Sequence, residues 1–247
     1  MPQPTSPERG RAPAADGAAA GGPEGILLID KPAGISSHTA VAAVKRALGG
    51  PRTGHAGTLD PFATGLLIVL VGRATKSQST FMGLTKRYET VARLGATSST
   101  GDPEGEIVET GRIPPDPPDL PTGVVRQRPP AHSAVKIGGE RAYRRARRGE
   151  VLDMPERLVD VHRFVQLWRK PPDADGPARA AFEIECGSGT YVRSLISDLG
   201  DAYCLELRRT AIGPFGVADA VAPPPRGERW VDPPLIGLTQ ALSMVGQ

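Results

Sequence analysis

Cysteine and histidine are scarce in this sequence, and it contains no long apolar run. Two cysteines, Cys186 and Cys204, and four scattered histidines provide neither a disulfide framework nor the ligand spacing of a zinc site. No apolar run approaches the roughly 20 residues that a membrane-spanning helix needs, and the N-terminus lacks the apolar core of a secretory signal. We therefore expect a cytoplasmic protein, with Cys186 in its core.

Several common catalytic motifs are missing as well. No glycine-rich loop follows a strand with the spacing of a P-loop or of a dinucleotide-binding motif, and no Ser, His, Asp order stands out. The composition, with 39% hydrophobic and 23% charged residues, is typical of globular proteins. At 247 residues the chain is long enough for one well-packed domain with a small appendage.

Positive charge is modest overall but concentrated in one segment. The formal net charge is +3 and the pI is about 9.0. Five arginines lie within residues 141–148, and Tyr143 lies among them. Such a cluster suits either the solvated face of a helix or contact with a phosphate backbone, and the residues alone leave both interpretations open.

The apolar pattern predicts an α+β protein. Residues 1–24, rich in Pro, Ala and Gly, are predicted to form a disordered tail. Period-2 or continuous apolar runs predict strands over residues 25–30, 65–72, 86–96, 158–168 and 178–186. Helical spacing predicts helices over residues 36–50, 74–83, 188–203 and 235–245. The proline-rich residues 112–123 are predicted to be a linker or loop around a weak helix, and a Gly-Gly turn between two short runs predicts a hairpin within 132–143. Strands and helices without a regular βαβ repeat favour a mixed, mostly antiparallel sheet.

The stretch GHAGTLDPFATG, residues 54–65, is predicted to be an irregular loop that ends at a buried strand. It contains Asp60 before a proline, where an aspartate commonly closes an Asx-turn with its own backbone. Such a loop can instead hold a carboxylate toward a ligand, and a carboxylate beside an arginine is oriented, stays ionised and can attack an electrophilic carbon. The candidate polar groups of the chain are Lys31, His55, Asp60, Tyr88, Tyr191 and Arg193. Aromatic rings among them would suit a flat substrate such as a nucleobase.

Five ordered motifs resemble those of the TruB family, the bacterial tRNA pseudouridine-55 synthases. They are GILLIDKPAGISSHTAVAAVKRALG, GHAGTLDPFATGLLIVLVGRATK, KRY, GTYVRSLISDLG and LRRTAIGPF, and the resemblance covers most of residues 25–247. It implies the pseudouridine synthase fold, with residues 25–247 as the catalytic domain. It further implies isomerisation of a T-loop uridine in tRNA, without a cofactor and with the base flipped out of its stack.

The resemblance also assigns roles to the candidate residues. Asp60 would be the catalytic nucleophile that attacks C6 of the base or C1′ of the ribose, and Arg193 would pair with it. Tyr88 would stack on the extruded uracil and assist proton transfer, and His55 would hold the base out of the T loop. The remaining three residues would bind substrate or have structural roles near the pocket: Tyr191, Leu207 and Lys31.

The resemblance gives the arginine-rich segment a function too. Residues 124–155 resemble the RNA-clamping insertion of the family, in which basic side chains contact the phosphates of the tRNA T-arm. On this basis we predict RNA-backbone contacts for Arg141, Arg144, Arg145 and Arg148. The chain is expected to act as a monomer with no protein partner.

Two departures from the family pattern accompany the resemblance. The connection DAYCLE, residues 201–206, is several residues shorter than usual, and it precedes Leu207 in the expected pocket wall. We also expect no C-terminal PUA-type RNA-binding domain, because only two residues follow residue 245. Two alternative functions follow from the same residues, a guide-RNA-dependent pseudouridine synthase and a noncatalytic tRNA-binding or folding chaperone.

Overall fold

A nine-stranded sheet runs through the protein in the computed structural model, which describes residues 22–174, 176–224, 228 and 230–246. The strands of this sheet are β1 (Gly25–Lys31), β2 (Thr53–His55), β3 (Thr64–Val71), β4 (Lys86–Leu94), β7 (Gly123–Gln127), β10 (Arg157–Lys170), β11 (Arg179–Cys186), β12 (Ala202–Ile212) and β13 (Phe215–Gly216). The main path is β1-β3-β12-β4-β11-β10-β7, with β2 added to β3 and β13 to β12. Every pair is antiparallel except β3 with β12. The prediction of an α+β fold with a mostly antiparallel sheet is therefore confirmed.

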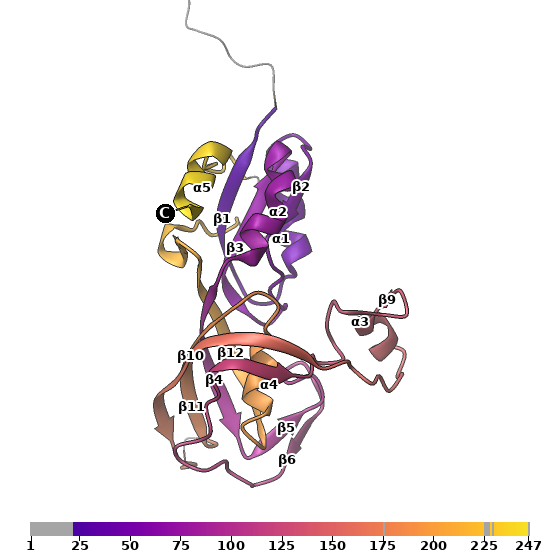
Figure 1. Ribbon diagram of the computed structural model, residues 1–247, viewed down its shortest axis with the longest axis vertical. Helices are drawn as coiled ribbons and strands as arrows, with labels where there is room; N and C mark the ends of the chain where they lie inside the picture. Colours follow the sequence, from indigo (N-terminus) through magenta and orange to yellow (C-terminus); the bar gives the residue numbers. More distant parts are fainter. Residues whose placement is uncertain (1–21, 175, 225–227, 229, 247) are drawn as a thin grey trace, which may run out of the picture.

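Strand β3 is the centre of the half of the sheet that is uppermost in Figure 1. Its alternate side chains enter two different apolar clusters, one on each face of the sheet, which explains the continuous apolar run from residue 65 to residue 71. Helix α1 (Ser37–Ala47) covers one face through Ala40 and Val44. The 3-10 turn η1 (Gly72–Ser77) and helices α2 (Gln78–Gly83) and α5 (Leu238–Val245) cover the other.

The lower half of the sheet in Figure 1 is built on β4, β10, β11 and β12. Strand β4 alternates as its sequence predicts, with Tyr88, Thr90 and Ala92 buried on one face. Helix α4 (Val192–Ser197) packs against β12, and a small two-stranded sheet of β5 (Ala96–Ser98) and β6 (Ile107–Glu109) lies at the far end. The short 3-10 turn η2 (Val217–Asp219) follows β13 and leads back to β1.

The two halves meet at a short parallel junction between β3 and β12. Only Thr64 with Arg208 and Gly65 with Arg209 are paired there. Gly65 has φ +101°, and a Cβ at this position would lie 2.3 Å from the carbonyl oxygen of Arg209. Glycine is thus required at the junction, both by backbone conformation and by close approach. The loop that carries Asp60 ends at this same point, directly before β3.

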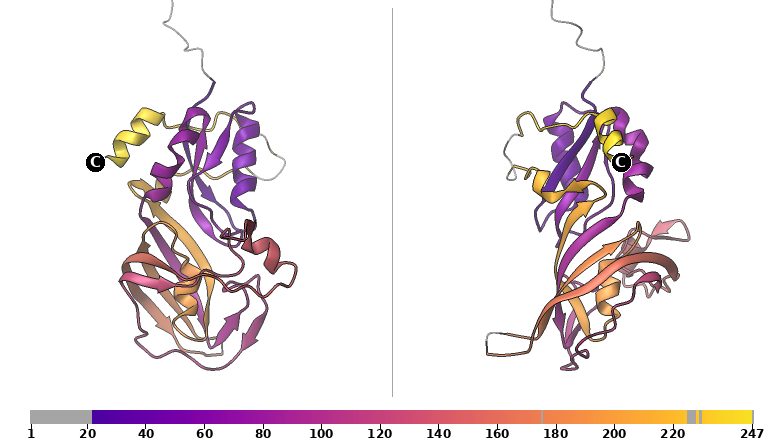
Figure 2. Two further views of the ribbon diagram at one scale, coloured as in Figure 1. Left: turned by 45° about the vertical axis from the view of Figure 1, so that its right-hand side comes forward. Right: turned by 60° about the vertical axis from the view of Figure 1, so that its left-hand side comes forward.

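An insertion between β7 and β10 stands off the sheet, as both views of Figure 2 show. It contains the hairpin of β8 (Lys136–Ile137) and β9 (Glu140–Arg141), followed by the short helix α3 (Ala142–Ala146). The predicted hairpin is therefore confirmed. Residues 124–127, which the sequence assigned to the insertion, belong instead to the main sheet, because β7 pairs with β10 along its whole length.

The structure corrects four of the local predictions. The proline-rich segment 112–122 forms no helix. The helix expected over 188–203 is α4 alone, which follows an N-cap at Tyr191 rather than a serine or threonine cap, and the last two residues of that range begin β12. Strand β12 was not predicted, and the first part of the Asp60 loop forms β2.

Residues 1–21 of the predicted tail lie outside the described residues. Glu24 is described, and its carboxylate pairs with the guanidinium of Arg73. Contacts with the fold therefore begin within the last residues of the predicted tail.

Candidate active site

Three buried side chains fix the backbone on both sides of Asp60. Ser37 Oγ donates to the carbonyl of Leu59 at 2.9 Å and accepts from its amide at 2.8 Å. Lys31 Nζ donates to the carbonyl of Pro61 at 3.3 Å. These contacts restrain the residues directly before and after Asp60, so that its carboxylate has little freedom to move.

Arg209 is the third of these side chains and is almost completely buried. Its guanidinium donates to the carbonyls of Gly57 at 3.1 Å, Thr58 at 3.4 Å and Leu66 at 2.7 Å. One side chain of β12 therefore joins the start of the Asp60 loop to the start of β3. Since a buried cation is costly unless its donors are satisfied, this arrangement ties the loop firmly to the sheet.

Arg193 contacts Asp60 from the first turn of α4. Its Nε lies 2.9 Å from Oδ2 of Asp60, an ion pair in which the N–H is not aligned as a hydrogen bond. The rest of the guanidinium is held by Asp102 Oδ2 at 3.1 Å, the carbonyl of Thr100 at 2.6 Å and the carbonyl of His132 at 2.9 Å. The side chain of Arg193 is only 3% exposed. The cation is therefore rigid, and it orients the carboxylate beside it.

The Asp60 side chain is 31% exposed, at the mouth of a cavity. Desolvation raises the pKa of its carboxyl above the usual value, and the neighbouring charge of Asp102 adds to this effect. The cations of Arg193 and Lys31 act in the opposite direction and favour the ionised form. Asp60 is thus a poorly hydrated carboxylate whose charge is supported mainly by Arg193.

An inner cavity of about 100 Å³ lies beside Asp60. Tyr88, Tyr191 and Leu207 line it together with Arg193, so that four of the predicted substrate-binding residues meet at the predicted nucleophile. Burial raises the pKa of the Tyr88 phenol, which is therefore protonated at neutral pH. Leu207 lies in the cavity wall despite the shortened connection, because residues 202–206 of that connection already belong to β12.

Tyr191 is anchored from two sides. Its backbone N–H donates to Gln127 Oε1 at 2.8 Å, and its carbonyl accepts from Gln127 Nε2 at 2.9 Å, which ties the N-cap of α4 to strand β7. The guanidinium of Arg157 lies 4.6 Å from the centroid of the Tyr191 ring, in cation–π geometry. The ring is therefore presented to the cavity in a defined orientation.

A wider outer cavity of about 540 Å³ adjoins the inner one and shares Asp60 and Arg193 with it. Its walls come from the start of α1, the loop around Asp102, and the insertion. On the insertion side the lining includes Tyr143 and three arginines, Arg141, Arg144 and Arg147. The predicted contacts Arg145 and Arg148 are placed elsewhere, in ion pairs with Glu140 and Glu150.

Two of the predicted substrate-binding residues line neither cavity. His55 lies in β2, where its ring meets that of His38 edge-on with 5.4 Å between centroids, and burial lowers its pKa to about 4. His38 does line the outer cavity. Lys31 is completely buried, its Nζ also donates to the carbonyls of Pro32 and Ile35, and burial lowers its pKa to about 8. Its contacts hold the loop rather than reach into a cavity.

Three residues of the site were not predicted from the sequence: Ser37, Asp102 and Arg209. Ser37 and Arg209 belong to the motifs SSHTAV and LRRTAIG, but nothing in their local pattern distinguishes them from ordinary helix and strand residues. Asp102 lies in a polar loop with two other acidic residues, Glu104 and Glu106. Their roles depend on contacts with residues up to 152 positions away in the sequence.

The described residues contain no cluster of three or more His, Cys, Asp or Glu side chains suited to a metal ion. Within the same residues, no helix is long and apolar enough to cross a membrane. The chemistry that the described site offers is therefore that of one oriented carboxylate, a buried guanidinium, a phenol and a flanking basic surface.

Known proteins with similar sequences carry the name of one enzyme family. Residues 45–192 match the family described as TruB family pseudouridylate synthase (N terminal domain). The chain is 45% identical over 214 residues to the tRNA pseudouridine synthase B of Thermobifida fusca, with 80% of this chain and 72% of that protein covered. It is 44% identical over 208 residues to the protein of the same name from Bradyrhizobium diazoefficiens, of which the chain covers 59%.

Two solved structures illustrate the likeness in fold. One is titled "Crystal Structure of a Cbf5-Nop10-Gar1 Complex", with a TM-score of 0.57 and 29% identity over 78% of this chain. Another is titled "Structure of H/ACA RNP bound to a substrate RNA containing 2'-deoxyuridine", with a TM-score of 0.57 and 25% identity over 80% of this chain. In both cases the matched region spans half of the solved chain.

Proposed function

We propose that this chain, which belongs to the TruB family of pseudouridylate synthases, isomerises a uridine of tRNA to pseudouridine. The observation that carries the proposal is the placement of Asp60. Its carboxylate is ion-paired with a buried arginine and faces a cavity lined by two tyrosines and a leucine. The proposed target is the uridine at position 55 in the T loop, and the catalytic unit comprises residues 25–247 with the insertion.

The proposed reaction begins with a flipped uridine in the inner cavity. Extruding a base costs a few kcal/mol, which stacking on Tyr88 and contacts with the cavity wall would offset. Ionised Asp60 attacks the nucleotide, at C1′ of the ribose or at C6 of the base, and the glycosidic bond between N1 and C1′ breaks. The uracil turns and its C5 bonds to C1′, while the bond to Asp60 breaks and frees the carboxylate. C5 then loses its proton and N1 gains one. The bond broken and the bond formed belong to the same nucleotide, so the atoms balance without a cofactor.

The neighbouring residues have distinct proposed tasks. Arg193 keeps Asp60 ionised and aimed, while Tyr191 and Leu207 confine the base. The phenol of Tyr88 is protonated and can donate a hydrogen bond to a uracil oxygen or pass a proton during the loss from C5. Lys31 and Arg209 hold the Asp60 loop, and His55 supports the adjacent surface through its contact with His38.

The proposed substrate is the T-arm stem-loop of tRNA, bound by a single copy of the chain in the cytoplasm without a protein partner or guide RNA. The solved neighbours include an RNP bound to substrate RNA, so dependence on a second RNA is the alternative to be tested. A purely RNA-binding role is the other alternative.

The test is pseudouridine formation in an unmodified tRNA transcript and in its isolated T-arm, with purified protein and no added RNA. We expect product at the T-loop uridine with wild-type protein, and none with Asp60→Asn protein that still binds the T-arm. Mass spectrometry of the variant must exclude conversion of the substituted asparagine back to aspartate. Wild-type protein that binds RNA but forms no product in either substrate would overturn the proposed function.

A further inference from the structure

The five arginines of residues 141–148 occupy two different environments. The outer cavity next to Asp60 is lined by Arg141, Arg144 and Arg147, which lie three residues apart at the N-cap, in the middle and at the C-cap of the short helix α3. Arg145 and Arg148 do not line that cavity. The first three are called the cavity arginines below.

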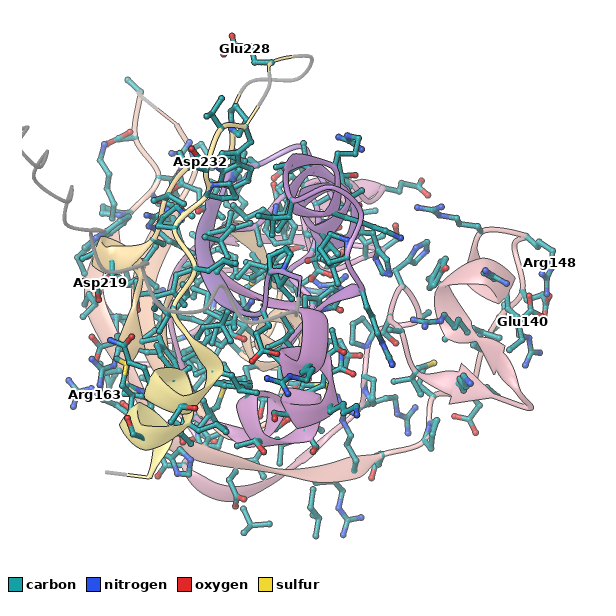
Figure 3. The ribbon with its side chains drawn as sticks, turned by 90° about the horizontal axis from the view of Figure 1, so that it is seen from above. Glu140, Arg148, Arg163, Asp219, Glu228 and Asp232 are labelled. Atoms are coloured by element: carbon teal, nitrogen blue, oxygen red, sulfur yellow. The ribbon has the colours of Figure 1, made fainter. Side chains whose placement is uncertain are left out.

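Arg145 and Arg148 form a compact cluster with two glutamates of the same insertion. The guanidinium of Arg148 forms a bidentate ion pair with the carboxylate of Glu140, with Nη1 donating to Oε1 at 2.7 Å and Nη2 donating to Oε2 at 2.9 Å. Arg148 Nη2 also contacts Glu150 Oε1 at 2.7 Å, and Arg145 Nε contacts Glu150 Oε2 at 2.6 Å. Figure 3 shows Glu140 and Arg148 side by side at the outer end of the insertion. These four residues are called the ion-pair cluster below.

The ion-pair cluster joins the elements of the insertion to one another. Glu140 belongs to β9, Arg145 to α3, and Glu150 to the segment that leaves the helix. An isolated surface ion pair contributes little to stability, but a bidentate arginine–carboxylate contact within a network is the favourable case. Two cations and two carboxylates also leave the cluster with no formal net charge. It therefore holds the hairpin and α3 together without adding positive potential.

The cavity arginines have a different set of neighbours. None of them forms an ion pair with an acidic residue in the part of the chain that the structure describes. Arg147 lies over the ring of Tyr143, 5.7 Å from its centroid. Asp102, an acidic side chain in the wall of the same cavity, is already ion-paired with Arg193. Their positive charge is thus directed at the space in front of Asp60.

We propose that the cavity arginines contact the phosphates that flank the target nucleotide, and that the ion-pair cluster holds the insertion in shape without touching RNA. This inference rests on the proposed function for the identity of the RNA. A phosphate could reach Arg145 or Arg148 only by displacing a carboxylate, and Glu140 and Glu150 would then face the polyanion unpaired. That exchange is unfavourable, whereas the cavity arginines bind phosphate without losing an ion pair.

Matched double variants test the division of roles. One double variant combines Arg144→Ala with Arg147→Ala, and the other combines Arg145→Ala with Arg148→Ala. Each removes two positive charges from the same short segment. The measurement is the affinity for the isolated T-arm at several salt concentrations. Each lost phosphate contact lowers the salt slope by roughly 0.7 to 0.9. We expect a slope reduced by about 1 to 2 for the first pair. For the second pair we expect an unchanged slope, with weaker binding by a salt-independent factor.

Amide hydrogen exchange of the free protein tests the role of the ion-pair cluster itself. Glu140→Gln with Glu150→Gln removes its carboxylates while keeping all five arginines. We expect faster exchange across residues 136–150 in this variant, and also in the variant that combines Arg145→Ala with Arg148→Ala. Exchange should be unchanged in the variant that combines Arg144→Ala with Arg147→Ala. Exchange that does not respond to loss of the glutamates would overturn the structural half of the proposal.

The RNA-binding half of the proposal would be overturned if the salt slope fell equally in the two arginine double variants. It would also be overturned if the slope did not fall in the variant that combines Arg144→Ala with Arg147→Ala. Wild-type protein that fails to bind the T-arm would also overturn it. Pseudouridine formation is measured separately in the same wild-type samples. Binding with the expected slopes but without product would therefore contradict the proposed function and leave the division of arginines intact.

Discussion

The Nε atom of Arg193 lies 2.9 Å from Oδ2 of Asp60, and Asp102 holds the same guanidinium from the other side at 3.1 Å. One buried cation is thus shared by two carboxylates, of which only Asp60 faces the inner cavity. Because Asp102 and two backbone carbonyls fix the guanidinium, its position does not depend on Asp60. In the proposed reaction, Asp60 leaves this ion pair to attack the substrate while the cation stays in place.

Loss of the Arg193 charge should move the acid limb of the pH–rate profile to higher pH. Desolvation already raises the pKa of Asp60, and Arg193 opposes that rise. Removing the cation in Arg193→Gln raises the pKa further, so that the active carboxylate is lost at a higher pH. We expect the midpoint of the acid limb to lie at a higher pH than in the wild type. The measurement is the single-turnover rate of pseudouridine formation across a pH series that spans both limbs of the profile.

Arg193→Lys is the control for this experiment, because it keeps the positive charge but loses the planar guanidinium. Its acid limb should stay close to that of the wild type, while its maximal rate falls through poorer orientation of Asp60. An Arg193→Gln profile with the wild-type midpoint would show that Arg193 does not support the charge of Asp60.

Ser37→Ala should slow catalysis through the Asp60 loop. The substitution leaves the amide and carbonyl of Leu59 without the hydroxyl that bonds to both, which costs about 1 to 3 kcal/mol of stability. Release of the loop should lower kcat by on the order of tenfold to a hundredfold, with T-arm affinity little changed. The measurements are chemical denaturation and single-turnover kinetics.

Ser36→Ala is the matched control on the neighbouring residue. Ser36 caps α1 by accepting from the Thr39 amide at 3.1 Å, and it makes no hydrogen bond to the Asp60 loop within the described residues. Its loss should cost about 1 kcal/mol of stability and leave the rate per folded molecule unchanged. Equal rate losses in Ser36→Ala and Ser37→Ala would mean that α1, rather than the Leu59 contact, supports the site.

Gly65→Ala should be among the most destabilising changes in the Asp60 loop. Its φ of +101° disfavours a side chain, and the new Cβ would lie 2.3 Å from the carbonyl oxygen of Arg209. We expect a loss of at least about 3 kcal/mol in the free energy of unfolding. Gly54→Ala is the comparison, because a Cβ added there would meet no atom within 4 Å and the φ of Gly54 is not positive, so that its effect should stay within about 1 kcal/mol. Similar losses in the two variants would contradict the close junction of β3 and β12.

Two substitutions of Tyr88 should distinguish its proposed stacking on the uracil from its proposed part in proton transfer. Tyr88→Phe keeps the ring in the inner cavity and removes only the hydroxyl, so that T-arm affinity should be retained while the rate falls by about 10²-fold or more. Tyr88→Leu removes the ring as well and should weaken binding by roughly 1 to 3 kcal/mol. The test compares dissociation constants with single-turnover rates. Wild-type turnover in Tyr88→Phe would restrict this residue to stacking.

Much of the fold followed from local patterns. The apolar run of β3, the alternation of β4 and the capped, amphipathic helix α1 each predict the element that the structure contains, because these patterns reflect which faces are buried. The proline-rich segment 112–122 gave a wrong helix, since its weak periodicity is overridden by prolines that cannot continue a helix.

Strand β12 was not predicted from its local sequence pattern. Its sequence AYCLELRRTAI mixes apolar and charged residues, and two irregularities in its pairing with β4 break the period-2 pattern. Arg209 in this strand is almost completely buried, although arginine is rarely found in a core. The backbone carbonyls of Gly57, Thr58 and Leu66 make that burial possible, because they accept from its guanidinium.

By itself the sequence determined the family, the loop that carries Asp60, and most strands and helices that support it. These features depend on neighbouring residues, through backbone preferences and the periodicity of burial. The tertiary structure decided which groups surround Asp60. It places Arg193, Tyr88, Tyr191 and Leu207 at one cavity, directs Lys31 and Arg209 to the backbone of the loop, and divides the arginines of the insertion. Electrostatic and hydrogen-bond contacts act over a few ångströms in space, so separation along the chain does not reveal them.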